Sequence, residues 1–123
     1  MILTIEVCKF IESCLKELSD KELQEHEWLY DDGDSSAEFV EVVCQLFDDS
    51  GLGDYLDAKS GDIILSKDLD IIMRELDSIL RAIDSKIGAK NILTHPNWSK
   101  VLGLSSQALT LIQELIIENE VVS

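Results

Sequence analysis

Proline and glycine are scarce in this chain, with one proline and six glycines among 123 residues. Disordered and low-complexity chains are usually rich in such residues, whereas 46% of the residues here are hydrophobic, which is enough for a core. The length suits one domain and is short for two. We therefore expect a single folded domain over residues 1–123.

Cysteine is scarce as well, and the three that occur lie among apolar residues: Cys8, Cys14 and Cys44. An odd number of cysteines in apolar surroundings is typical of small core residues in a reducing compartment, not of a disulfide framework. We expect all three to be core residues and the protein to reside in the cytoplasm.

Long apolar runs are missing. The most apolar stretch, residues 109–117, is interrupted by Gln113 and Glu114 and is too short to span a bilayer. The first twelve residues carry Glu6, Lys9 and Glu12, which a signal peptide would not place in its apolar core. The sequence therefore predicts a soluble protein without membrane contact.

Basic residues are outnumbered, with 10 Lys and Arg against 25 Asp and Glu and a formal net charge of −15. Nucleic acids and anionic membranes are bound by clustered Lys and Arg, and the chain has no such patch. Its natural partners are basic proteins.

Complete motifs for metals, cofactors and catalysis are missing too. The acidic run at residues 31–34 fails the EF-hand pattern, because Trp28 and Tyr30 stand where that loop needs acids. With only His26 and His95 as histidines, a zinc site lacks ligands. There is no phosphate-binding glycine loop. We expect no metal, no cofactor and no enzymatic activity.

Apolar residues recur every three or four positions through most of the chain, which is the period of an amphipathic helix. They predict helices over residues 2–18, 20–30, 36–48, 67–87 and 106–119, with a short helix at 96–102 and a loop with about one helical turn at 49–65. The predicted N-caps are Ser19, Ser35, Ser66 and Ser105. The fold class is all-α, a single-domain helical bundle of about five helices with short loops.

The negative charge is concentrated in one half of the chain. Residues 1–62 hold 17 acids and four bases, a balance of −13, whereas residues 63–123 hold eight acids and six bases, a balance of −2. Residues 17–34 are the densest part, and a second group lies at 48–57. A one-sided field accelerates encounter with a basic partner. We expect the acids to share one surface once the helices pack.

The candidate partner-binding residues come from these two groups. Their carboxylates would occupy Lys and Arg of the partner, and aromatic side chains beside them would supply the buried contacts that often dominate interfaces. They are Glu25, Glu27, Trp28, Tyr30, Asp31, Asp32, Asp34, Asp54, Tyr55 and Asp57.

In size, acidity, helical content, cysteine usage and the acidic–aromatic stretch EWLYDDGD at residues 27–34, the chain resembles the small acidic immunity proteins that bacteria make against their own toxins. The resemblance implies an inhibitor that covers the basic substrate groove of a nuclease-like toxin. Two alternatives stay open: a helical adaptor that binds through an apolar groove along residues 112–117, and a DNA-mimic antagonist of a DNA-binding protein. The oligomeric state is open as well.

Overall fold

The computed structural model describes residues 2–29, 33–58 and 62–122, and this part of the chain contains helices and no strand. The α-helices are α1 (Ile5–Ser19), α2 (Lys21–Leu23), α3 (Ala37–Cys44), α4 (Leu52–Asp57), α5 (Lys67–Ala82), α6 (Ala89–Leu93) and α7 (Trp98–Val122). Two π-helical turns, η1 (Gln24–Trp28) and η3 (Gln45–Asp49), extend α2 and α3. The predicted all-α bundle is confirmed.

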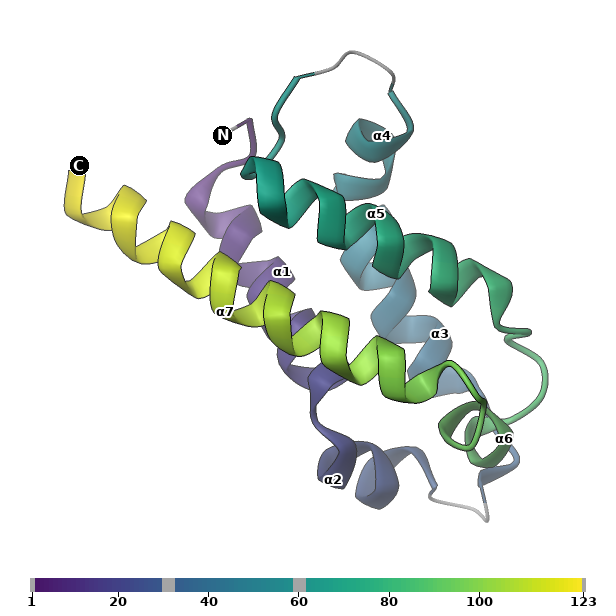
Figure 1. Ribbon diagram of the computed structural model, residues 1–123. Coiled ribbons are helices and arrows are strands. Elements are labelled where there is room, and N and C mark those ends of the chain that lie inside the picture. Colours follow the sequence, from purple (N-terminus) through teal and green to yellow (C-terminus); the bar gives the residue numbers. More distant parts are fainter. Residues whose placement is uncertain (1, 30–32, 59–61, 123) are drawn as a thin grey trace.

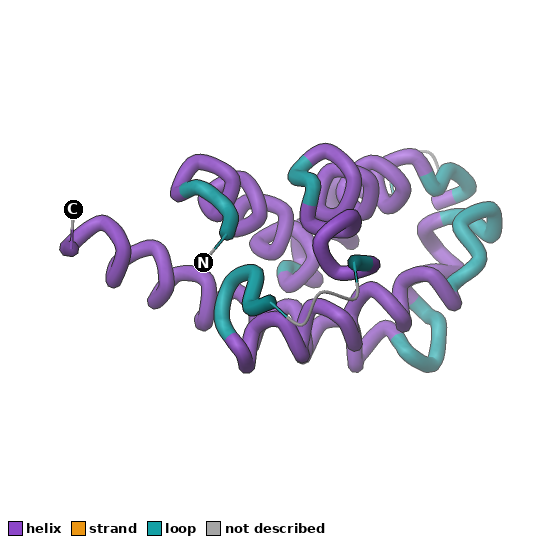
Figure 2. Tube along the Cα trace, turned by 90° about the horizontal axis from the view of Figure 1, so that it is seen from above, coloured by secondary structure: helices purple, strands orange, loops and turns teal. Residues whose placement is uncertain are grey.

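The long helices form two layers. In Figure 1, α5 and α7 lie in front of α1 and α3, and the perpendicular view of Figure 2 separates the same two pairs. The longest helix, α7, packs against α1 across the layers and against α5 within its own layer. One face of α5 and α7 therefore points to solvent, and the other covers the core.

Buried side chains from every long helix fill the space between the layers. Three aromatic rings, Trp28, Phe39 and Trp98, meet edge-on with centroids 5.6 to 6.1 Å apart and fix η1 against α3 and the start of α7. Cys8 and Cys14 are buried as predicted, but Cys44 is exposed, because it lies on the side of α3 that faces away from the core.

Helix ends are where the sequence-based predictions fail most often. Asp20, and not Ser19, caps α2 by accepting the Leu23 N–H at 3.0 Å. Ser66 caps α5 as predicted, accepting the Leu69 N–H at 3.3 Å. The predicted N-cap Ser105 is wrong: α7 runs through it without a break, and the residue is fully buried.

Asp70 is an acid of α5 that is buried in the fold. Its buried carboxylate accepts the backbone N–H groups of Ile64 at 2.8 Å and Leu65 at 2.9 Å. These bonds tie the segment that precedes α5 to the helix. Another acid of α5 makes an ion pair along the helix, since Arg81 Nε lies 2.9 Å from Asp77 Oδ1.

In the described part of the chain, α7 is the one helix whose length and composition would let it cross a membrane. Its packing against α1 and α5 is compatible with the predicted soluble domain. Residence in the cytoplasm stays a prediction.

Candidate partner-binding site

The two acidic groups lie at opposite ends of the molecule. Turn η1, with Glu25 and Glu27, contacts the start of α3 and α6, whereas α4, with Asp54 and Asp57, contacts η3 at the far end of the same helical segment. This segment is roughly 20 Å long, and Figure 1 shows α2 and α4 at opposite ends of the bundle. The expectation of one common acidic surface is wrong, because α3 holds its two flanking segments apart.

The structure places the candidate partner-binding residues at two separate ends of the molecule. Glu25, Glu27 and Asp34 are exposed near one end, and Asp54, Tyr55 and Asp57 are exposed near the other. Lys21 lies 3.9 Å from Glu25, and Arg81 lies 3.8 Å from Asp57, so these two acids are partly compensated. The remaining candidates, Tyr30, Asp31 and Asp32, lie outside the described residues.

Trp28 is a core residue and not a surface contact for a partner. Its side chain is 1% exposed and packs against Phe39 and Trp98. The indole N–H donates to Glu17 Oε2 at 3.1 Å. The expectation that Trp28 reaches a partner is therefore corrected: its rings fill the core, and its one polar atom holds a glutamate in place.

That glutamate belongs to a pocket between α1, η1 and the α3–η3 segment. The pocket has a volume of about 350 Å³, and Leu23, Trp28 and Val42 form its apolar wall. Its polar lining consists of Glu17, Glu27, Glu38, Glu41 and Gln45. We call it the four-glutamate pocket; none of the described residues that line it is basic.

The pKa of Glu17 reflects the electrostatics of the four-glutamate pocket. Burial raises the pKa of its carboxyl group, and the negative charges of Glu41, Glu38 and Glu27 raise it further, while the hydrogen bond from Trp28 opposes both. The ionised form of Glu17 is thus destabilised by burial and by the neighbouring negative charges. A cation bound in the pocket would offset this destabilisation.

The sequence pointed to only one of these four glutamates, Glu27. Glu17 belongs to the dense acidic segment at residues 17–34, and Glu38 and Glu41 lie outside both acidic groups. Their spacing carried a signal, since Glu38, Glu41 and Gln45 follow at i, i+3 and i+7 and so share one helix face. Only the packing of α1 beside α3 turns that face into a pocket wall.

Among the described residues, no three His, Cys, Asp or Glu side chains are arranged to hold a metal ion. The four-glutamate pocket instead combines its four carboxylates with an apolar wall. Such an arrangement suits an extended organic cation, above all the planar guanidinium group of arginine, which can bond several carboxylates at once.

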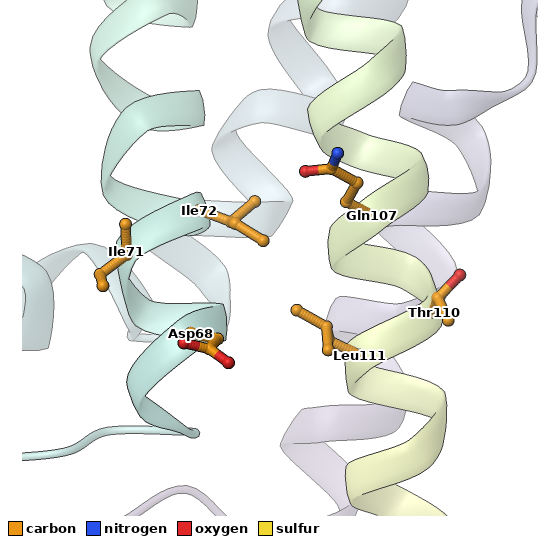
Figure 3. A pocket seen from close by; sticks show the side chains of 6 residues that line it. All are labelled: Asp68, Ile71, Ile72, Gln107, Thr110 and Leu111. Carbon is orange, nitrogen blue, oxygen red and sulfur yellow. The ribbon is translucent and has the colours of Figure 1, made fainter.

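A second hollow lies between α5 and α7, on the solvent side of that layer (Figure 3). It has a volume of about 550 Å³, and Ile72 and Leu111 point toward each other across it. The other lining residues are Asp68, Ile71, Gln107 and Thr110. The groove predicted along residues 112–117 is thus wrongly placed, because Ile112 and Ile116 face the core.

Comparison with known proteins gives a family and no relative of assigned activity. No curated protein and no solved structure matches the chain. Residues 6–119 match a family described as a domain of unknown function, and this match spans all the helices except the first residue of α1 and the last turn of α7. The chain belongs to that family, DUF7945.

Proposed function

We propose that the protein is an acidic protein-binding inhibitor that recognises a basic partner through the four-glutamate pocket, as an immunity protein neutralising a nuclease-like toxin would. The observation that carries this proposal is the pocket itself: four carboxylates, an apolar wall and no basic residue among its described lining. A site of this kind is complementary to an arginine or lysine side chain.

The chemistry of the pocket favours arginine. The apolar wall of Leu23 and Val42 accommodates the methylene stem, while the surrounding carboxylates accept the guanidinium N–H groups. The hydrogen bond from the Trp28 indole fixes one carboxylate before the partner arrives. A pre-positioned acceptor lowers the ordering cost of binding.

The net charge of the chain adds long-range attraction to this recognition. Glu25 is not part of the site, because it lines a separate hollow with Lys21 and Lys90. A nuclease binds the phosphates of its substrate with Lys and Arg. Carboxylates of the four-glutamate pocket would occupy those side chains and exclude the nucleic acid, and the net charge of −15 would steer the two proteins together.

Capture of the partner tests the proposal. The immobilised protein is incubated with a lysate of its source organism at low salt, proteins are eluted with a salt gradient, and the eluted proteins are identified. We expect a basic protein to be retained. When this protein is purified, its nuclease activity should fall to near zero at an equimolar amount of the chain.

Two charge-matched variants locate the binding surface. The triple variant Glu17→Gln/Glu38→Gln/Glu41→Gln removes three charges from the pocket, and Asp48→Asn/Asp49→Asn/Asp54→Asn removes three at the far end of the α3–η3 segment. We expect the first to weaken binding by at least about 100-fold, the second by less than about tenfold. Equal losses in both variants, or retention that salt does not affect, would contradict the proposal.

A further inference from the structure

We infer that Gln24 is a positioning residue of the four-glutamate pocket. Its side chain links the start of α7 to the end of α1 and so fixes the orientation of the Glu17 carboxylate, on which the preference of the pocket for arginine over lysine depends. The inference rests on the proposed function, because it concerns how that pocket recognises a cation. Gln24 is not among the residues that line the pocket, and it acts on the cation only through Glu17.

The side chain of Gln24 is fully buried, with 0% of its surface exposed, and both of its polar atoms have partners. The amide nitrogen donates to the backbone oxygens of Glu17 at 2.8 Å and of Leu18 at 3.0 Å. The amide oxygen accepts the Trp98 indole N–H at 3.1 Å. Carbonyl oxygens require a donor and an indole N–H requires an acceptor, so these partners determine which way the amide group points.

These hydrogen bonds hold the end of α1. Glu17 and Leu18 lie in the last turn of that helix, where no later turn of α1 supplies an N–H group to their carbonyl oxygens. The Asp20 N–H reaches the Glu17 oxygen at 3.3 Å, and Gln24 adds a shorter bond from η1. The backbone of Glu17 is therefore fixed relative to η1, the turn that forms one wall of the pocket.

The same turn fixes the side chain of Glu17. Trp28, four residues after Gln24 in η1, donates its indole N–H to Glu17 Oε2 at 3.1 Å. The Trp28 ring packs edge-on against the Trp98 ring, with centroids 5.6 Å apart. Trp98 thus contacts η1 twice, through the Gln24 hydrogen bond and through the Trp28 ring. The start of α7 consequently determines where both contacts to Glu17 lie.

A carboxylate of fixed orientation favours a guanidinium group over an ammonium group. The guanidinium fork is planar and rigid, and it bonds a carboxylate best when both oxygens lie in its plane. An ammonium group is a compact charge with three rotatable donors, so it accepts a carboxylate in many orientations. Loss of the Gln24 link should therefore weaken arginine binding more than lysine binding, whereas loss of charge from the pocket would weaken both.

The indole N–H signals of the two tryptophans show the network directly in NMR spectra. Trp28 donates to an ionisable carboxylate, whereas Trp98 donates to a neutral amide. As the pH falls and Glu17 takes up a proton, the Trp28 signal should shift and the Trp98 signal should stay nearly constant. Gln24→Met keeps the length of the side chain and removes all three amide hydrogen bonds. We expect it to reduce the pH-dependent shift of Trp28 by about half or more.

Blocked amino acids test selectivity without the partner protein. N-acetyl-arginine amide and N-acetyl-lysine amide are titrated at constant ionic strength, and the Trp28 indole signal is followed. We expect the wild type to bind the arginine probe about tenfold more tightly, and Gln24→Met to lower this ratio to about twofold. Trp98→Phe removes only the indole N–H, so it is the milder second variant and should lower the ratio in the same direction.

Ile112→Val is the matched control. It lies at a fully buried site of α7 outside the network, so it lowers stability without removing a hydrogen bond and should keep the wild-type ratio. Circular dichroism verifies that the variants fold. A wild-type ratio in both network variants, or an equal loss of both probes, would overturn the inference and leave the proposed function standing. A wild-type pocket that binds neither probe would contradict both, and failure to capture a basic partner despite the expected ratios would contradict the inhibitor role alone.

Discussion

At the scale of single residues, the structure assigns two acids to internal tasks and leaves many others in solvent. Glu17 accepts the Trp28 indole N–H at the edge of the four-glutamate pocket, and Asp70 accepts two backbone N–H groups. Both were indistinguishable in the sequence from their exposed neighbours, because the partners of Glu17 and Asp70 lie five to eleven residues away and meet them only after folding.

Replacing Glu17 by Gln should stabilise the fold at neutral pH. The raised pKa of this carboxyl means that the folded state binds more protons than the unfolded state between the ordinary and the raised value, so its ionisation costs stability as pH rises through that window. Gln can still accept the indole N–H and carries no charge. We expect a gain of up to about 1 kcal/mol at pH 7 after screening by solvent.

Urea unfolding of Glu17→Gln and wild type at about pH 7 and about pH 3.5 checks this prediction, because wild-type Glu17 is protonated at the lower pH and the difference should vanish. Glu12→Gln, on the same helix but outside the pocket, is the control and should change stability by less than about 0.5 kcal/mol. A destabilised Glu17→Gln at neutral pH would show that the hydrogen bond outweighs the repulsion.

Replacing Asp70 by Ala should destabilise the fold strongly. It removes two charge-assisted hydrogen bonds and leaves the N–H groups of Ile64 and Leu65 buried without that acceptor, at a cost of about 3 kcal/mol. Asp70→Asn, which keeps one acceptor oxygen, should lose about half as much. Hydrogen exchange should accelerate at the amides of residues 64 and 65 before other sites, and Asp68→Ala, at an exposed acid two residues earlier on α5, should leave those amides protected.

At the scale of elements, amphipathic periodicity predicted where the helices are, and local chemistry predicted their ends poorly. Ser19 and Asp20 can both cap a helix, and in the structure Asp20 is the N-cap of α2. Ser105 was expected to begin a helix, yet it is buried within α7 and its hydroxyl has no hydrogen-bond partner among the described residues. Packing against α1 favours an unbroken helix there and overrides a capping signal that is purely local.

The candidate site was predicted less well than the fold for a related reason. The periodicity of a helix shows that Glu38 and Glu41 share its polar face, but not which helix lies opposite. The aromatic cluster that positions the pocket joins Trp28 to Trp98, which no local pattern relates. Acidity was visible in the sequence; the enclosure that makes four of the acids into one pocket depends on long-range packing.

An alanine at Gly103 tests whether α7 is one continuous helix in solution. Gly103 lies in the helix interior, is exposed, and has open space where a Cβ atom would be added. Gly103→Ala should therefore stabilise the protein by about 0.5–1 kcal/mol through helix propensity and lower chain entropy. If the chain instead broke near Ser105, the substitution would bring no gain.

The control for this experiment is a glycine that cannot be replaced. Gly88 has a φ of +85°, and an added Cβ would lie 2.8 Å from the backbone oxygen of Gly33. Gly88→Ala should destabilise the fold by more than about 1 kcal/mol, since strain and steric overlap act together. Thermal unfolding of the two variants and the wild type should show a higher Tm for Gly103→Ala and a lower Tm for Gly88→Ala.

At the scale of the whole molecule, charge and structure divide the chain in the same place. The segments that precede α5 supply the four-glutamate pocket and most of the negative charge, whereas α5 and α7 supply the apolar groove and a near-balanced surface. The side that carries the four-glutamate pocket is the one that we propose for a basic partner, and the α5–α7 groove shares no lining residue with it.

The excess of acids predicts opposite effects of salt on folding and on partner binding. In the part of the chain that the structure describes, five ion pairs of exposed Lys and Arg residues compensate few of the acids, so self-repulsion opposes the compact state and sodium chloride should relieve it. Between about 10 and 500 mM salt, at constant protein concentration, we expect the Tm to rise by several degrees. Association with the basic partner should slow by tenfold or more over the same range, with little change in dissociation.

The variant Asp48→Asn/Asp49→Asn/Asp54→Asn separates these two effects. It removes repulsion from the end of the molecule that lies away from the four-glutamate pocket, so its Tm should start higher at low salt and rise less steeply. Its association rate with the partner should keep most of the wild-type salt dependence, because the glutamates that meet the partner are unchanged. A Tm that falls with salt in the wild type would mean that attractive ion pairs outweigh repulsion, and the directed negative field invoked for partner capture would then be too weak to act.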